Sequence, residues 1–488
     1  MSAPIIPGFF PDPTVCRVGT DYYLATSSFE YFPAVPIFHS TDLLTWTQIG
    51  HAFDRESQLD LQSSGSGVGG IYAPTLRYHD GTYFLITTNV STADQGHMIV
   101  TSTDPAGPWS DPVFAPGFDG IDPDLTWDAD GMCHLTWSSY APGLEGIAQV
   151  PFDVRTGTAL GPARVIWKGT GLAWPESPHL YLVDGRWILT IAEGGTERGH
   201  CITVARSRNI DGPYESAAQN PIFTHRSTPS PIQNVGHGDL VQTPTGEWAM
   251  VYLAVRVAGI TPGFHVNGRE TFLAGIDWAD GWPVVDEHRY EVPPTETGFS
   301  DEFAGALDLR WISPGSAASG WTEPSASGGL DLHADPTGGT RLLAVRARDP
   351  EWSVSADVDA ARGTGGLVIR LDDDHWCSVE VGRAEIVARL SLRAGVIELG
   401  RTSRVGDEIS LWLRVTVPEA GHNAPVGPDV IELGAITAGE SASLGSFDGR
   451  YLSTEVAGGF TGRVVGVAPS SGTLRVSSFS YRPGRAGS

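Results

Sequence analysis

Short apolar runs, broken by turns that contain Gly or Asp, fill the first 300 positions of the chain. In each of the clearest runs an aromatic residue or a histidine follows the turn, and a strand-like apolar stretch comes next. The five runs are VGTDYYLATSS, HDGTYFLITTN, DADGMCHLTWSS, VDGRWILTIAEGG and PTGEWAMVYLAV. Short apolar segments bounded by turn residues are typical of β-strands, so the pattern predicts an all-β fold.

The runs recur at a nearly constant interval. Anchored on Tyr22, Tyr83, His134, Trp187 and Trp248, they are 61, 51, 53 and 61 residues apart. A unit of about 55 residues matches one four-stranded blade of a β-propeller with its loops. Five units therefore predict a five-bladed β-propeller over residues 1–298.

The pattern changes near residue 298, after the segment VPPTETG. From Asp301 onward the aromatic turn repeat disappears, and short alternating strands such as EIVARLSLR and ISLWLRVTV are separated by polar, Gly-rich turns. Alternation with few helical segments is typical of a β-sandwich. We expect a second, C-terminal β-sandwich domain over residues 299–488.

Composition narrows the range of partners. The 488 residues include 57 acidic and 31 basic side chains, which gives a net charge of −26. Such a surface repels phosphate backbones and anionic lipid headgroups, so we expect neither a nucleic-acid nor a membrane partner. A neutral ligand fits this charge, and association into a homo-oligomer stays open.

The N-terminal segment MSAPIIPGFFPDP lacks the basic and apolar regions of a signal peptide. The four cysteines, Cys16, Cys133, Cys201 and Cys377, are widely spaced and form no CxxC pair. Free, buried thiols suit a reducing compartment, so a cytoplasmic location is expected.

Three acidic residues next to prolines stand near the beginnings of repeat units. Asp12, Asp122 and Glu176 precede the anchor residues of units one, three and four by 10, 12 and 11 positions. Corresponding positions in different blades would direct these carboxylates into one central channel. Glycoside hydrolysis needs such a pair, one acid to protonate the leaving oxygen and one carboxylate to activate water or attack. A third carboxylate nearby would raise the pKa of the acid.

The same segments carry a family resemblance. PGFFPDPTVCRVGTDYYLATSS, GGIYAPTLRYHDGTYFLITTN, GIDPDLTWDADG, WPESPHLYLVDG, NGRETFLAGIDWADGWPVV and FDGRYLSTEVAGGFTG, in this order, resemble glycoside hydrolase family 43. The similarity covers essentially the whole chain and is strongest to the β-xylosidase and α-L-arabinofuranosidase branch with a C-terminal concanavalin-like β-sandwich (jelly roll). It implies a five-bladed propeller and an inverting mechanism, with Asp12 as general base, Asp122 as pKa modulator and Glu176 as general acid. Ser177 stands where many relatives have Gly.

The resemblance also implies a set of pocket residues. Arg269 in NGRETFL would clamp sugar hydroxyls, and Tyr72 and Thr196 would contribute to the substrate pocket. Phe32 in FEYFPAVP would either form part of the pocket wall or pack between blades. His237 in NVGHGDL would lie at the centre of the channel, where it bears on an ordered water or a metal ion. No cofactor is required; the positive charge near the three acids is expected from Arg269, with a Ca²⁺ ion in the channel as the alternative.

We therefore expect an exo-acting, inverting glycosidase that releases single pentoses from neutral xylo- or arabino-oligosaccharides. It would be a β-D-xylosidase, an α-L-arabinofuranosidase or both. An arabinan-degrading hydrolase is the alternative enzyme, and a non-catalytic carbohydrate-binding propeller is the alternative from another class.

Overall fold

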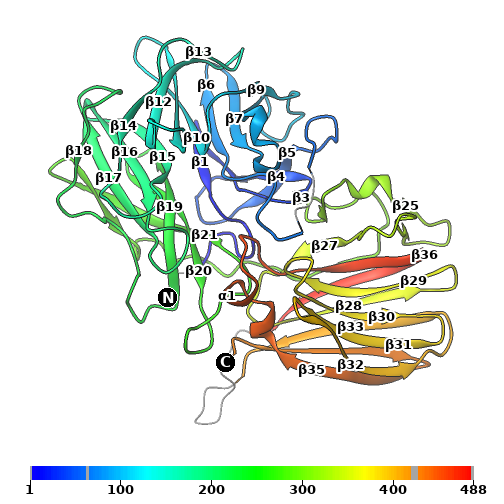
Figure 1. Cartoon of the computed structure of the whole chain (residues 1–488). Helices are drawn as coiled ribbons and strands as arrows, with labels where there is room; N and C mark the ends of the chain where they lie inside the picture. Colours follow the sequence, from blue (N-terminus) through cyan, green and yellow to red (C-terminus); the bar gives the residue numbers. More distant parts are fainter. Residues whose placement is uncertain (1–2, 62–64, 419–426, 485–488) are drawn as a thin grey trace.

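A computed structural model describes residues 3–61, 65–418 and 427–484 and shows two all-β parts (Figure 1). The N-terminal part consists of five antiparallel sheets arranged around one axis. The first strands of neighbouring sheets contact one another: β1 meets β6 and β19, and β10 and β15 continue the ring. This is the five-bladed propeller that the repeat predicts.

Each blade begins at the axis and proceeds outward. The first two blades are β1 (Thr14–Val18), β2 (Asp21–Ala25), β4 (Ala34–Ser40), β5 (Thr47–Phe53), and β6 (Thr75–His79), β7 (Thr82–Thr88), β8 (His97–Ser102), β9 (Val113–Ala115). The third is β10 (Gly120–Trp127), β11 (Cys133–Ser139), β12 (Gly146–Asp153), β13 (Thr158–Ala159), with β14 (Arg164–Trp167) beside β12. The last two are β15 (Glu176–Val183), β16 (Arg186–Glu193), β17 (Cys201–Ser207), β18 (Glu215–Ser216), and β19 (Ile232–Gln242), β20 (Trp248–Arg256), β21 (Glu270–Ala279), β22 (Trp282–Asp286).

The five anchors of the sequence repeat all lie in the second strand of a blade, namely β2, β7, β11, β16 and β20. The ring is closed by the N-terminal segment, because the backbone N–H groups of Ile5 and Ile6 donate to the carbonyl of Thr271 in blade five. Val15 and Leu24 of blade one pack with Val251 of blade five in one buried cluster. Apolar packing of this kind between blades fixes where the inner strands end.

The C-terminal part is a β-sandwich organised around β36 (Val464–Pro483), which pairs with β28 and β29 and continues along β23, β26 and β27. Its other strands are β23 (Phe299–Asp301), β25 (Thr322–Pro324), β26 (Leu330–His333), β27 (Leu343–Arg346), β28 (Trp352–Asp359), β29 (Gly363–Arg370), β30 (Trp376–Val381), β31 (Glu385–Leu392), β32 (Gly395–Ser403), β33 (Glu408–Thr416), β34 (Val430–Thr437) and β35 (Glu440–Asp448). Alternate residues of these strands form one large apolar core. The predicted boundary at 298/299 falls between the end of β22 and the start of β23.

The two parts are joined directly. β3 (Tyr31–Phe32) of the propeller pairs with β24 (Ser313–Pro314), and Arg370 of β29 forms a buried 2.7 Å ion pair with Glu30. Helical segments are short: η1 (Val90–Gln95), η2 (Ala318–Gly320), η3 (Gly449–Leu452) and α1 (Thr454–Ala457). Within the described ranges, no helix has the length and apolar character to cross a membrane. All four cysteines are free and buried, as expected.

Candidate active site

The inner strands of the five blades share one pairing register near the propeller axis. Regular pairing with the second strand begins at Thr14↔Ala25, Thr75↔Ile86, Asp124↔Thr136, His179↔Thr190 and Asp239↔Val251, and we take the residue two positions before each of these pairs as the starting position of the inner strand. The equivalent starting positions are therefore Asp12, Ala73, Asp122, Ser177 and His237. All except Ala73 have a left-handed backbone, with φ of 56°, 54°, 57° and 46°. Such a conformation is uncommon for residues other than Gly, and its repetition marks a functional rim.

This register corrects one detail of the sequence interpretation. Glu176 pairs with Ala192 three residues before His179, as Ile121 pairs with Ser138 three residues before Asp124. Glu176 is thus equivalent to Ile121, and the position equivalent to Asp12 and Asp122 is occupied by Ser177. The prediction that the three acids share one repeat phase is wrong by one residue for Glu176, because the hairpin turn is longer in blade three (Trp127↔Cys133) than in blade four (Val183↔Arg186) and this difference hides the offset in the sequence spacing.

The three acids nevertheless line one cavity of about 400 Å³ at the propeller axis. Its polar wall contains Asp12, Asp122, Glu176, His237 and Arg269. Its apolar wall is formed by the aromatic side chains Phe29, Tyr72, Tyr140, Trp174 and Phe460. A concave, largely aromatic pocket with a few convergent polar groups is the usual form of a small-ligand site. Aromatic rings of this kind also pack against the apolar face of a sugar.

Asp12 is held by a cation. Nη1 of Arg269 donates to Oδ1 of Asp12 at 2.8 Å and also approaches Oγ1 of Thr196 at 3.1 Å. The hydroxyl of Ser27 donates to the other carboxylate oxygen of Asp12. The guanidinium lies 5.4 Å from the ring centre of Phe29 and 5.5 Å from that of Phe460. Arg269 therefore supplies a fixed positive charge at the carboxylate.

The other two acids are placed to hold protons. Burial, followed by the negative charge of Asp12, raises the pKa of Asp122 to about 7. Burial, followed by the charges of Asp122 and Asp12, raises the pKa of Glu176 well above its usual value, and Arg269 only partly opposes this. Coupled carboxyl groups in one desolvated site retain a proton near neutral pH, which a general acid requires.

His237 faces the carboxylates from blade five. Its Nδ1 lies 2.6 Å from Oγ of Ser177 and 3.8 Å from Oδ1 of Asp12. Burial lowers the pKa of His237 to about 3, so the imidazole is neutral. In the described part of the chain, no group of three His, Cys, Asp or Glu side chains is arranged to hold a metal ion. The side chains around His237 therefore do not form a protein-ligated metal site.

The remaining predicted pocket residues divide into two groups. Tyr72 and Thr196 line the cavity, with the Tyr72 hydroxyl donating to the carbonyl of Val68 at 2.7 Å. The placement of Phe32 in the pocket wall is wrong: Phe32 is 3% exposed, does not line the cavity and packs among residues of blades one and two, which is the alternative that the sequence left open. Phe29, three residues earlier in the same loop, provides the aromatic wall instead. The alternation of the FEYF segment gave no means of choosing between the two rings.

Sequence reasoning also missed two contributors. Phe460 reaches the pocket from the C-terminal part, where its ring packs 5.6 Å from Phe29 and 5.9 Å from Tyr72 and its N–H donates to Gly67. His200 places Nε2 3.7 Å from Oε1 of Glu176, with Nδ1 3.0 Å from the carbonyl of Asn234. The GGFTG motif could have indicated Phe460; nothing in the local sequence around His200 singled it out.

Below the cavity, one arginine pairs with two buried carboxylates near the propeller axis. Arg77 lies 2.9 Å from Asp124 and 2.9 Å from Asp239, two buried carboxylates that come two residues after Asp122 and His237. The positive charge of Arg77 lowers the pKa of Asp239 well below its usual value, and it also lowers the pKa of Asp124. These acids are therefore permanently ionised structural groups, in contrast to Asp122 and Glu176 above them.

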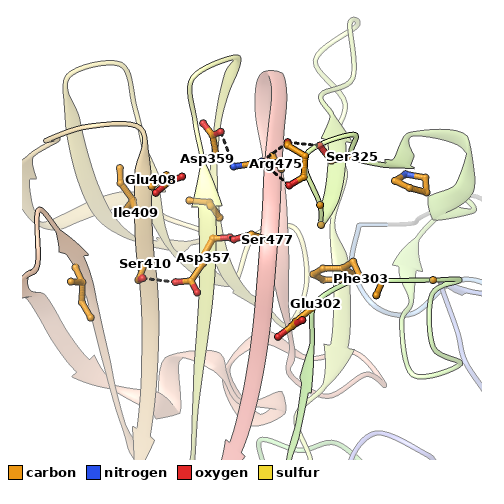
Figure 2. A pocket seen from close by; sticks show the side chains of 18 of the residues that line it. Glu302, Phe303, Ser325, Asp357, Asp359, Glu408, Ile409, Ser410, Arg475 and Ser477 are labelled. Atoms are coloured by element: carbon orange, nitrogen blue, oxygen red, sulfur yellow. Dashed lines mark hydrogen bonds and ion pairs between the residues drawn. The ribbon is translucent and has the colours of Figure 1, made fainter.

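A larger concavity, about 940 Å³, lies on the sandwich surface (Figure 2). Two of its acidic side chains are engaged locally: Asp359 pairs with Arg475 at 3.1 Å, and Asp357 accepts hydrogen bonds from Ser410 and Ser478. Figure 2 shows these groups spread along adjacent strands, and none of the catalytic candidates lines this surface. The propeller axis is therefore the candidate active site.

Comparison with protein families agrees with both parts of the fold. Residues 1–283 match the model of "Glycosyl hydrolases family 43". Residues 300–479 match "Beta xylosidase C-terminal Concanavalin A-like domain". The first match alone covers more than half of the chain.

Individual relatives cover either the whole chain or the propeller. A non-reducing end α-L-arabinofuranosidase of Bacteroides ovatus is 35% identical over 96% of this chain and 90% of its own. A xylosidase/arabinosidase of Butyrivibrio fibrisolvens is 47% identical over 58% of this chain, which spans about half (56%) of that relative. Among solved structures, a Bacteroides ovatus GH43B from a xyloglucan locus (TM-score 0.88, 33% identity, 99% of both chains) is similar throughout. So is a xylan β-1,4-xylosidase of Bacillus halodurans (TM-score 0.87, 30% identity, 99% and 100%).

Proposed function

The chain belongs to glycosyl hydrolases family 43, and from this premise we propose that it is an exo-acting, inverting glycosidase that releases single pentoses from neutral oligosaccharides. Its activity is that of a β-D-xylosidase, an α-L-arabinofuranosidase or both. The observation that carries the proposal is the pairing of one carboxylate held by Arg269, at Asp12, with a second, buried carboxyl group at Glu176 whose pKa is raised. Inverting hydrolysis requires this division into a base and an acid.

We propose the following roles in the reaction. Asp12 accepts a proton from a water molecule, and the water oxygen forms a bond to the anomeric carbon. The bond from that carbon to the glycosidic oxygen breaks at the same time, and the proton of Glu176 passes to the departing oxygen. Together with burial, the negative charge of Asp122 raises the pKa of Glu176, so Glu176 keeps its proton until the glycosidic bond breaks. The water attacks from the face opposite the leaving group, so the sugar product has the inverted configuration.

The cover that the C-terminal part places over one side of the cavity supports release of a single terminal sugar. Phe460 of the C-terminal part covers the pocket against Phe29 and Tyr72, which limits the space beyond one sugar ring. An arabinan hydrolase that cleaves within chains would need an open groove, so this observation disfavours the second enzyme candidate. Retention of a charge-paired base and a raised-pKa acid disfavours a purely carbohydrate-binding role.

Substrate identity is proposed from chemistry and from the relatives. D-xylopyranose and L-arabinofuranose are neutral pentoses that suit an aromatic pocket with few charged donors. The printed names of the relatives include xylosidases, arabinosidases and an α-L-arabinofuranosidase. We propose that both pentosides are accepted and that no dissociable cofactor is needed, with Arg269 supplying the positive charge at the acids.

Proton NMR of early turnover tests the proposed function. With a β-xyloside as substrate, α-xylose should appear before mutarotation equilibrates the anomers. Parallel measurement of kcat/KM on 4-nitrophenyl β-D-xyloside and 4-nitrophenyl α-L-arabinofuranoside ranks the two sugars. Initial formation of β-xylose would contradict the inverting mechanism, and absence of turnover on both pentosides would contradict the substrate class.

A further inference from the structure

A separate cavity of about 430 Å³ lies between the propeller and the sandwich. Phe10, Phe38 and Trp46 line it from the propeller side, and Arg346 and Arg348 line it from β27 and the residues that follow. It shares no lining residue with the catalytic cavity in the part of the chain that the structure describes. Guanidinium groups and aromatic rings thus face one enclosed space.

Arg346 is the unusual member of this set. It is only 4% exposed, and its Nε and Nη2 atoms are buried without a hydrogen-bond partner among the described residues. Its close contacts are aromatic, with the guanidinium 4.5 Å from the ring centre of Phe10 and 5.5 Å from that of Phe9. Burial lowers the pKa of Arg346 to about 9, and no carboxylate offsets this. A buried charge without a counter-ion is costly, so its retention indicates a ligand.

Other buried arginines in the sandwich show what is missing. Arg370 lies 2.7 Å from the carboxylate of Glu30, and Arg463 lies 2.6 Å from that of Asp429. Both are as buried as Arg346, and each has a carboxylate partner. At these two other positions in the sandwich, a carboxylate therefore balances the charge of the buried guanidinium group. Arg346 lines a cavity, and no carboxylate of the described residues pairs with it.

The charged groups next to Arg346 do not balance its positive charge, so one added negative group would be favourable there. Asp308 is occupied by Arg310, whose Nε lies 2.8 Å away, and His51 near Arg346 is neutral because burial lowers its pKa to about 3. Arg348 adds a second guanidinium, although its Nε already donates to the carbonyl of Pro7 at 3.2 Å. Glu296 lies at the exposed rim.

We propose that this cavity binds a uronic acid, a sugar that carries one carboxylate. Arg346 would attract a carboxylate through its positive charge on the side of the guanidinium that lines the cavity, since its Nε and Nη2 atoms are covered by protein. The ring faces of Phe10 and Trp46 suit the apolar side of a sugar ring. The carbonyl oxygen of the Gln48 amide and the second carboxylate oxygen of Glu296 would accept hydrogen bonds from sugar hydroxyls, because the Gln48 amide nitrogen already contacts His51 and Leu309 and one oxygen of Glu296 accepts from Gly298. A phosphate dianion fits less well, because the acidic rim repels its second charge and the aromatic walls offer it nothing.

Calorimetric titration of the wild-type protein with sodium D-glucuronate tests the proposal. Excess D-xylose and L-arabinose fill the catalytic cavity during the titration, so binding there does not contribute. One saturable site for glucuronate is expected, with no matching site for neutral D-glucose or for inorganic phosphate. Loss of the signal when the pentoses are added would place the ligand in the catalytic cavity and overturn the proposal. Tighter binding of phosphate than of glucuronate would overturn the ligand class.

Arg346→Met, which keeps the length of the side chain and removes its charge, should weaken glucuronate binding by about tenfold or more. Arg346→Lys should retain part of the affinity. Arg393→Met removes an exposed charge from the sandwich surface and serves as the matched control. Unchanged affinity in a folded Arg346→Met protein would refute the site. If that variant does not fold, a wild-type crystal soaked in glucuronate decides, since the carboxylate must lie at Arg346.

Discussion

The hydroxyl oxygen of Ser177 lies 2.6 Å from Nδ1 of His237, and the same hydroxyl is 3.2 Å from Oδ2 of Asp122. An ionised Asp122 only accepts hydrogen bonds, so Ser177 donates to it and in turn accepts the Nδ1–H of His237. This fixes the tautomer of the neutral imidazole. Ser177 thereby connects the pKa modulator of blade three with the channel-facing histidine of blade five.

Ser177→Ala should lower kcat several-fold and move the acidic limb of the pH profile to higher pH. The Ser177 hydroxyl and backbone N–H both lower the pKa of Asp122. When the hydroxyl is removed, the pKa of Asp122 rises above about 7, and this group is protonated at pH values where it is ionised in the wild type. The proton then resides on Asp122 in place of Glu176 in a larger share of molecules. Steady-state kinetics between pH 4 and 9 measures this.

Ser138→Ala is the matched control for this prediction. Its hydroxyl is also buried beside the cavity, but it donates to the carbonyl of Pro175 at 2.8 Å and not to Asp122. Its pH profile should coincide with that of the wild type. If both variants shift the acidic limb equally, the effect belongs to general loosening of the site and not to the Ser177 hydroxyl.

Glu176→Gln should discriminate between substrates by their leaving groups. Hydrolysis of xylobiose, whose alcohol leaving group needs a proton, should fall by about 10²–10⁴-fold. Hydrolysis of an activated aryl xyloside should fall far less, because a nitrophenolate departs without protonation. Glu197→Gln, which changes another carboxyl group lining the same cavity, should show no such dependence. Equal losses on both substrates in Glu176→Gln would remove Glu176 from the acid role.

Asp122→Asn should abolish most activity while stabilising the fold at neutral and alkaline pH. The pKa of Asp122 rises from 3.8 to about 7 on folding. Below pH 3.8 both states are protonated and the carboxyl group carries no penalty. As the pH rises from 3.8 through about 7, stability is lost, because the unfolded chain releases a proton that the folded protein retains. The amide avoids this loss, worth about 1–4 kcal/mol.

Thermal unfolding at pH 4 and pH 8 measures the difference. The melting temperatures of the wild type and Asp122→Asn should be nearly equal at pH 4, and the variant should melt higher at pH 8. A variant that is less stable than the wild type at pH 8 would show that ionised Asp122 is well solvated, contrary to the raised pKa.

The sequence predicts the propeller well because each repeat of the sequence corresponds to one blade of the structure. Tyr22, Tyr83, His134, Trp187 and Trp248 mark the same strand of each blade. Turn residues before each ring mark the hairpin, so blade number and order follow from spacing alone. The same spacing could not place Glu176, since the hairpin turns between the inner and second strands differ in length between blades three and four, and this difference is larger than the one-residue offset between Glu176 and the position equivalent to Asp122.

Pocket residues that come from loops cannot be identified from the local pattern of apolar and polar residues. Phe29 and Phe32 are both buried aromatic residues in one loop, and only the path of the chain decides that Phe29 faces the axis. Phe460 lies more than 400 positions from Phe29, and its contact with the propeller depends on how the sandwich docks. Such long-range contacts have no period that a sequence pattern could reveal.

Phe460→Ala should reduce kcat/KM by about 10–100-fold, chiefly through a higher KM. The ring packs on Phe29 and Tyr72 and covers the guanidinium of Arg269, so its removal opens the pocket to water and deletes apolar contact with the sugar. Tyr451→Ala changes a 42% exposed aromatic residue on the preceding segment and should behave as the wild type. Kinetics on both 4-nitrophenyl pentosides measures the effect. Unaltered kcat/KM would show that the sandwich does not complete the site.

Dialysis against EDTA should leave kcat/KM within about twofold of its starting value, and added Ca²⁺ should not raise it. Nδ1 of His237 is occupied by Ser177, and in the described residues no three His, Cys, Asp or Glu side chains are arranged to hold a metal ion. Ca²⁺ binds six to eight oxygen atoms and would find almost all of them in water. Arg269, 2.8 Å from Asp12, already provides a positive charge. Loss of activity on chelation, restored by Ca²⁺ in the wild type and absent in His237→Ala, would show instead that a channel ion shares this role.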